Sequence, residues 1–171
     1  DNMMITRHVI REFGKYALGA EHSNLISSIV PGVMAQTGME SLEIIRGVIR
    51  ETEPDCIVAV DALAARSVKR LNRTIQITNT GINPGSGVGN HRHGLNRESV
   101  GIPVIAIGVP TVVDAATIVN DAISGYYEEV DCTLNSFFVT PKDIDESIKR
   151  LSFTISEGLN LAFEKTACTN S

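Results

Sequence analysis

The sequence predicts an α/β fold, a three-layer α/β/α sandwich with a mostly parallel sheet, formed by a single domain over residues 1–171. Two apolar runs, Cys56–Val60 and Val104–Val109, lack polar alternation, which is typical of strands covered on both faces of a parallel sheet. Each run leads into a segment with helical apolar spacing. Strands and helices that alternate through short links favour helices packed on both faces of one sheet.

The individual elements follow from local patterns. Residues 2–16 place apolar side chains on one helical face, and the run at 24–30 reads as a short strand. Helical spacing continues over 38–54, where Pro54 forces a stop. The remaining expected elements are a strand at 56–60, a helix at 62–72, a strand with alternation at 74–78, a strand at 104–109, a helix at 112–123 and a long helix at 140–165. Thr140 is expected to be the N-cap of that last helix, with Pro141 as its first residue.

Charge and cysteine content narrow the class of protein. The net charge is −5, and no Lys/Arg block is longer than a pair, so direct nucleic-acid binding has no electrostatic support. The three cysteines show no metal-binding spacing, and Cys56 falls in an expected buried strand, which favours a reducing, cytoplasmic compartment. No apolar run approaches the length of a membrane span, and residues 1–16 do not read as a signal peptide.

Asp61 is the best single candidate for chemistry. It follows the strand 56–60, and ligands of open α/β sheets bind at the carboxyl ends of strands. The alternative is a helix N-cap for residues 62–72, and the two roles are compatible. Two interpretations are also open for Asp114. It lies either at that sheet edge, or in the first turn of the following helix, where an acid complements the helix dipole. Arg66, one expected helical turn after Asp61, is a candidate partner for a carboxylate or a solvated helix residue.

The Gly/Asn-rich segment 79–103 is longer than common loops, and long loops of this kind are often functional. Its "NPGSGVGN" is not the GxGxxG of dinucleotide-binding proteins, so we expect a substrate-contacting loop. The candidate substrate-groove residues in it are Asn83, Gly85, Gly87 and Gly89. His91 and His93 are spaced for a metal, but no carboxylate or Cys motif lies beside them, which favours a solvated loop.

Several long segments resemble one family. "IVPGVMAQTGMES", "VAVDALAARSVKRLNRTIQITNTGINPGSGVGN" and "VGIPVIAIGVPTVVDAATI", together with "DNMMITRH" and "FFVTPKDIDESI", are similar to the germination proteases of spore-forming bacteria. The resemblance implies a homotetrameric endopeptidase of the spore core, made as a self-processed zymogen, that degrades small acid-soluble spore proteins. It implies a fold similar to that of hydrogenase-maturation proteases and catalysis by two aspartates, with no metal or other cofactor.

Residue by residue, the resemblance carries only one catalytic position onto this chain. The Asp of the family's "DALAARS" motif is Asp61, and the second Asp belongs to a segment that precedes the equivalent of "DNMMITRH", upstream of residue 1. Asp1 corresponds to a different Asp of the family. The stretch 124–136 is also shorter than in the family, so the chain is expected to be truncated and to lack a complete pair of aspartates.

Two alternatives remain open. In a metal-linked maturation protease of the same fold, His91 or His93 would ligate an ion together with Asp61. The other alternative is an inactive α/β binding module.

Overall fold

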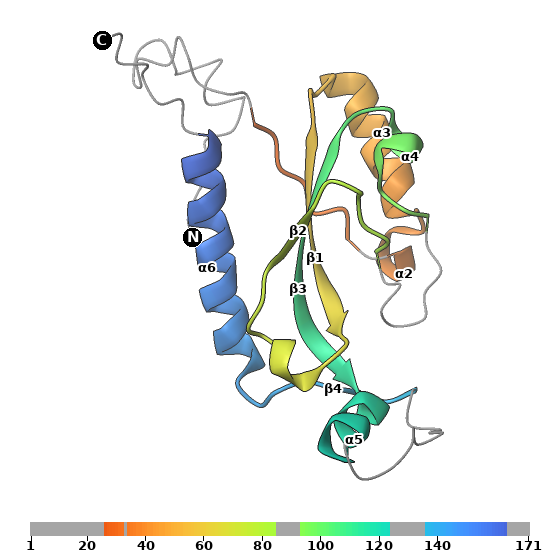
Figure 1. Ribbon diagram of the computed structural model, residues 1–171. Helices are drawn as coiled ribbons and strands as arrows, with labels where there is room; N and C mark the ends of the chain where they lie inside the picture. The colour runs from red at the N-terminus through yellow and green to blue at the C-terminus, as the bar shows by residue number, and fades with distance from the viewer. Residues whose placement is uncertain (1–25, 33, 85–92, 124–135, 164–171) are drawn as a thin grey trace, which may run out of the picture. The chain divides into compact units, whose positions relative to one another are not determined.

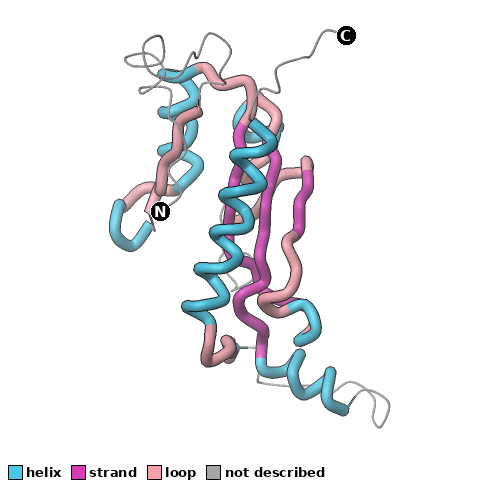
Figure 2. Tube along the Cα trace, turned by 90° about the vertical axis from the view of Figure 1, so that its left-hand side faces the viewer, coloured by secondary structure: helices cyan, strands magenta, loops and turns pink. Residues whose placement is uncertain are grey.

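The computed structural model describes residues 26–32, 34–84, 93–123 and 136–163. Two compact units divide the chain, and Pro31–Ile144 forms the unit that holds the sheet. Within the other unit, the structure describes residues 26–30 and the long helix α6, Ile144–Phe163, except for its first residue. This helix is unbroken along its length (Figure 2). The helix expected at 2–16 lies outside the described residues.

The sheet is built around strand β3, Val104–Asp114. Strand β1, Ile57–Ala65, pairs with it in parallel, and the two arrows point the same way in Figure 1. On the other side of β3, the short strands β2, Gln76–Thr78, and β4, Phe138–Val139, pair with it antiparallel. The α/β class is confirmed, and the longest pairing is parallel, but the sheet is mixed. The three-layer arrangement stays a prediction.

Helix α3, Ser41–Thr52, covers the amino-terminal part of one sheet face, where Leu42 joins Leu95 and Val104 in a buried cluster. It begins with a capping box, in which the Glu43 side chain accepts the Glu40 N–H, and it ends at Glu53 in a left-handed conformation before Pro54. The helix expected at 38–54 is therefore confirmed. Two single-turn helices, α2 (Met34–Thr37) and α4 (Arg97–Val100), flank it.

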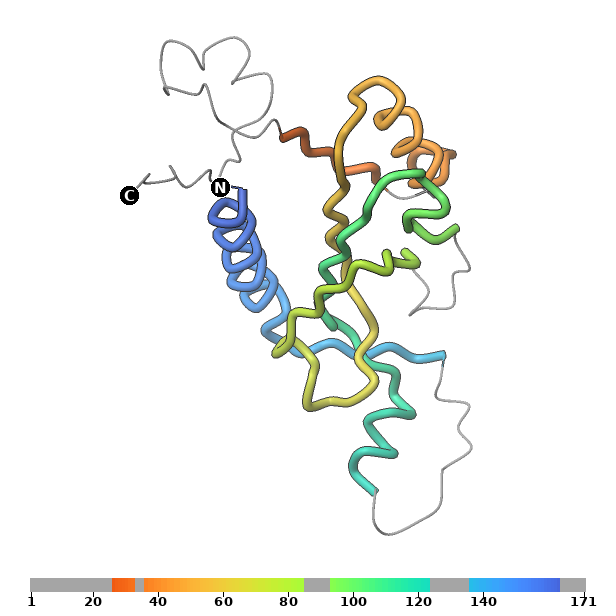
Figure 3. The backbone as a smooth tube through the Cα atoms, turned by 45° about the horizontal axis from the view of Figure 1, so that its top comes forward, coloured from red at the N-terminus to blue at the C-terminus, as the bar shows by residue number. Residues whose placement is uncertain are grey.

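The helix expected at 62–72 is wrong. Strand β1 continues through this stretch to Ala65, with a shift of its register with β3 between Leu63 and Ala64. The chain then loops back (Figure 3), and the helical part of this loop is the three-residue 3₁₀ helix η1, Val68–Arg70. Alanine, leucine and arginine favour helix, but their propensities amount to tenths of a kcal/mol per residue (about 0–0.7) and are overridden by pairing with β3.

Other boundaries also differ from expectation. Strand β3 runs five residues past Val109, so helix α5 begins only at Ala115 and ends at Ile123. Thr140 does not cap α6, because its hydroxyl donates a hydrogen bond to the carbonyl of Thr111. That bond fixes the chain beside β3, and the helix starts four residues later. The strand at 74–78 is confirmed as the short β2, which pairs with β3 and with no other strand that the structure describes.

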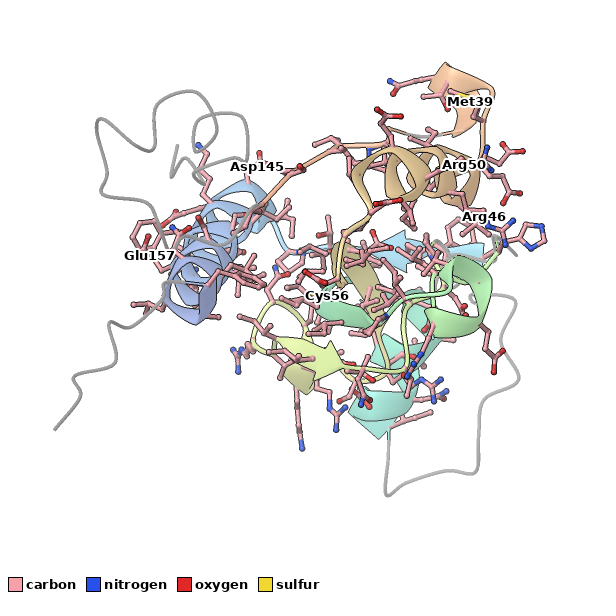
Figure 4. The ribbon with its side chains drawn as sticks, turned by 90° about the horizontal axis from the view of Figure 1, so that it is seen from above. Met39, Arg46, Arg50, Cys56, Asp145 and Glu157 are labelled. Carbon is pink, nitrogen blue, oxygen red and sulfur yellow. The ribbon has the colours of Figure 1, made fainter. Side chains whose placement is uncertain are left out.

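Two expectations of strand structure and burial near the amino end of the sheet unit are wrong as well. The described residues of the strand expected at 24–30 form no strand, and Val30 is 93% exposed. Cys56 is exposed, because β1 begins one residue later. Figure 4 shows Cys56 apart from Arg46 and Arg50, which lie on α3. Within the described part of the chain, no helix has both the length and the apolar character needed to cross a membrane.

Candidate functional site

Asp61 lies in the middle of β1, directly opposite Gly108 of β3. Its position is a correction to the expected one at a strand end, and the helix-cap role is excluded because the backbone remains a strand for four further residues. The side chain is half-buried, and its Oδ1 accepts a hydrogen bond from the Ala62 N–H at 2.9 Å. The carboxylate is thus anchored to a backbone that the sheet holds in place.

The face of the sheet on which Asp61 lies follows from strand alternation. Ile57, Ala59 and Asp61 project from the same face, and the first two pack against the cluster under α3. Asp61 is the next residue on that face, about 7 Å further along the strand. It therefore borders the core instead of lying within it, a position where a carboxylate is shielded from water on one side.

Gly108 and Leu63 fit together beside Asp61. A Cβ on the buried Gly108 would lie 2.7 Å from Leu63 Cγ, so the Leu63 side chain occupies the space where any larger residue would project. On the far side of Gly108, its register partner in β2 is Gln76. Asp61, Gly108 and Gln76 therefore form one row across three strands, and no local sequence pattern marks Gln76.

Arg66 and Asp114 lie away from this row. In a strand, five residues span about 16 Å, against about 7 Å in the helix expected there, so Arg66 is not a neighbour of Asp61. Asp114 is the last residue of β3, opposite Phe138, and its Oδ1 and Oδ2 accept hydrogen bonds from Thr117 N and Thr117 Oγ1, both at 2.7 Å. Its geometry is that of a residue that caps α5.

The long loop is closed at its base. Ile82 and Leu95 exchange two backbone hydrogen bonds of 2.9 and 2.7 Å, and Asn83 follows directly. Asn83 is exposed, and its carboxamide lies so close to Gly94 that a Cβ there would collide with it. The other expected groove residues, Gly85, Gly87 and Gly89, and also His91, lie outside the described residues, whereas His93 is described and exposed.

Among the residues that the structure describes, no group of three or more His, Cys, Asp or Glu side chains is arranged to hold a metal ion. Since His91 is not one of those residues, the metal-linked alternative is not tested by the geometry.

Comparisons with known proteins agree on one family. The family model for germination protease matches residues 1–128. A germination protease of Caldanaerobacter subterraneus subsp. tengcongensis is 42% identical over 193 residues, which cover 95% of this chain and 59% of that protein. One of Clostridium perfringens is 40% identical over 192 residues, covering 95% and 58%. One of Bacillus velezensis is 54% identical over 123 residues, covering 72% and 33%.

The chain thus spans less than two thirds of the length of these curated relatives. The alignment to the Caldanaerobacter protein is 193 residues long, more than the 171 residues of the whole chain, so the relative carries residues within the alignment that have no counterpart here. The expectation that the stretch 124–136 is shorter here than in the family predicts extra residues of this kind in the relative. Because the family model covers most of the sequence, the chain belongs to the germination protease family.

Proposed function

We propose that this chain provides the catalytic Asp61 of an endopeptidase that degrades small acid-soluble spore proteins during germination. The observation that carries the proposal is the position of Asp61, a half-buried carboxylate held in the middle of β1 at the edge of the core. This residue is also the Asp of the "DALAARS" segment on which the resemblance to the family rests. Family membership supports a peptidase, and the pairing of β1 with β3 supplies a rigid support for its carboxylate.

The proposed chemistry is hydrolysis by two carboxylates of unlike protonation. The ionised carboxylate takes a proton from a water molecule, whose oxygen attacks the scissile carbonyl carbon. The protonated carboxylic acid donates a hydrogen bond to the carbonyl oxygen, and a proton reaches the amide nitrogen as the C–N bond breaks. Asp61 is one of the two groups, and the second comes from outside the described residues.

Partners and location are proposed on the resemblance. The substrates are the small acid-soluble spore proteins, the enzyme is a homotetramer that matures from a zymogen, and it acts in the spore core, with neither direct nucleic-acid binding nor a membrane. Sedimentation of the purified protein tests the oligomer, because a monomeric species at micromolar concentration is incompatible with a stable tetramer.

The test of the proposal replaces Asp61 by Asn in the protein as expressed from its own gene. Asn has the same shape and its Oδ1 still accepts the Ala62 N–H, so the fold is retained while proton transfer is lost. We expect cleavage of a small acid-soluble spore protein to fall by about 10²–10⁴-fold, the usual contribution of general acid–base catalysis. The matched control is Asp55→Asn, the same change at an exposed residue ahead of β1, which leaves cleavage unchanged.

Full turnover by Asp61→Asn contradicts the proposal. Metal analysis of the active protein distinguishes the two-carboxylate mechanism from the metal-linked alternative. A stoichiometric metal whose removal abolishes cleavage would support the alternative, in which His91 or His93 binds the ion together with Asp61.

A further inference from the structure

The row Asp61–Gly108–Gln76 contains a second polar side chain on the same face of the sheet. Residues that are direct register partners project to the same side, so Asp61 and Gln76 both stand on the face that α3 covers further along. Two strand spacings put their Cα atoms about 10 Å apart. Gly108, which has no side chain, lies between them, and the Leu63 side chain covers it.

The surface between the two polar residues is apolar. Leu63, two residues after Asp61 on the same strand, fills the place where a side chain of Gly108 would project. A peptide group laid between Asp61 and Gln76 would rest on this side chain, which keeps water from its lower side. Hydrogen bonds in such an environment are stronger than in bulk water.

Gln76 is available to bind something. Its side chain is exposed and makes no hydrogen bond to another residue in the part of the chain that the structure describes. A carboxamide offers two N–H donors, whereas an ionised carboxylate only accepts. Of the three residues in the row, Gln76 is the one whose side chain donates hydrogen bonds to a carbonyl oxygen whether Asp61 is ionised or protonated.

We propose that Gln76 is a further catalytic residue, whose carboxamide N–H donates a hydrogen bond to the oxygen of the scissile carbonyl. A peptide group between two side chains about 10 Å apart is within reach of both, since each hydrogen bond takes up about 3 Å. The bond shortens as negative charge develops on that oxygen during attack by water, so it stabilises the transition state more than the bound substrate. This role rests on the proposed peptidase function of Asp61.

The test uses Gln76→Glu, which keeps the shape but brings a negative charge, and Gln76→Leu, which removes both donors. Loss of one donor to a developing oxyanion costs about 10²–10³-fold in kcat, so we expect that fall in both variants, with KM within about twofold of its original value. Gln36→Glu, the same change at an exposed residue outside the sheet, is the matched control. Because Gln76 is exposed, both variants should unfold at the same urea concentration as the parent protein.

A second readout separates transition-state stabilisation from simple binding. In the Asp61→Asn background, adding Gln76→Leu should change the Kd for an uncleaved spore protein by less than about threefold, because the bond is weak in the ground state. A tenfold weaker Kd overturns the transition-state role.

The two proposals fail in different ways. Normal kcat in Gln76→Leu, with cleavage lost in Asp61→Asn, overturns the assignment of Gln76 alone. Turnover retained by Asp61→Asn overturns both.

Discussion

The hydroxyl of Ser67 donates a 2.9 Å hydrogen bond to Oδ2 of Asp121, which links the segment after β1 to helix α5. The same oxygen accepts the N–H of Val68 at 2.8 Å, and the Ser67 Oγ in turn accepts the N–H of Lys69. Three hydrogen bonds therefore fix the direction in which the chain leaves the strand that carries Asp61.

This link predicts different effects for two substitutions of Asp121. Because a single oxygen accepts both bonds, Asp121→Asn presents an equivalent acceptor and should change stability little. Asp121→Ala leaves the Ser67 hydroxyl and the Val68 N–H without that acceptor and should lower the free energy of unfolding by about 1–2 kcal/mol. Urea unfolding measures both, and equal losses in the two variants would show that the charge, not the acceptor, matters.

The fit of Gly108 against Leu63 predicts the result of a double-mutant cycle. Gly108→Ala alone should lower the free energy of unfolding by about 1–3 kcal/mol, because its methyl group overlaps the Leu63 side chain in a buried strand. In the Leu63→Ala background, the space is vacant and the same change should cost clearly less. If the two substitutions are strictly additive, the contact does not govern this position.

The cap of α5 predicts what Asp114 contributes. Asp114→Ala removes the acceptor for Thr117 N and should cost about 1 kcal/mol, whereas Asp114→Asn keeps it. Neither change should alter kcat or KM at a temperature where the protein is folded, because Asp114 lies more than about 15 Å from Asp61 along the strand. A raised KM with unchanged stability would instead place Asp114 in the substrate groove.

The base of the long loop is tested at Gly81. This residue has a φ of 87°, and a Cβ on it would lie 2.8 Å from the Asn96 Cα. The matched control is Gly38, with a φ of 68° and open space around its Cα. Gly38→Ala should cost about 1–2 kcal/mol for the left-handed backbone alone. Gly81→Ala should cost more, as measured by urea unfolding, and similar losses would mean that the backbone of Asn96 moves away freely.

The parts of the fold that were predictable from sequence are those where one local signal dominates. Helix α3 has an amphipathic face and a proline just after its end, and the buried β3 has an unbroken apolar run. The segment after Asp61 was wrongly predicted to be a helix because its residues are good helix formers. The strand β3, which keeps it in a sheet, is more than forty residues away in the sequence. β4 was missed because two residues are too few to form a pattern.

The candidate site was predictable only in part. Asp61 stands out in sequence as a lone acid within an apolar stretch, and its catalytic role stays a prediction. Gln76 carries no such signal, because a polar residue in a short alternating strand is ordinary. Its relation to Asp61 depends on the register of two strands with the same Gly108, and register is a property of tertiary pairing that neither segment encodes alone.

The apolar character of β1 on both sides of Asp61 has a consequence for deletions. When a strand has apolar residues on both faces, a register shift by one position still leaves apolar side chains on the core face. Such a shift nevertheless turns Asp61 to the opposite face of the sheet. The interlock of Leu63 with Gly108 is the feature that distinguishes the correct alignment from its neighbours. Removal of a single residue between Ile57 and Asp61 therefore sets the pairing before the deletion against this interlock, and Asp61 turns to the opposite face of the sheet if the earlier pairing is kept.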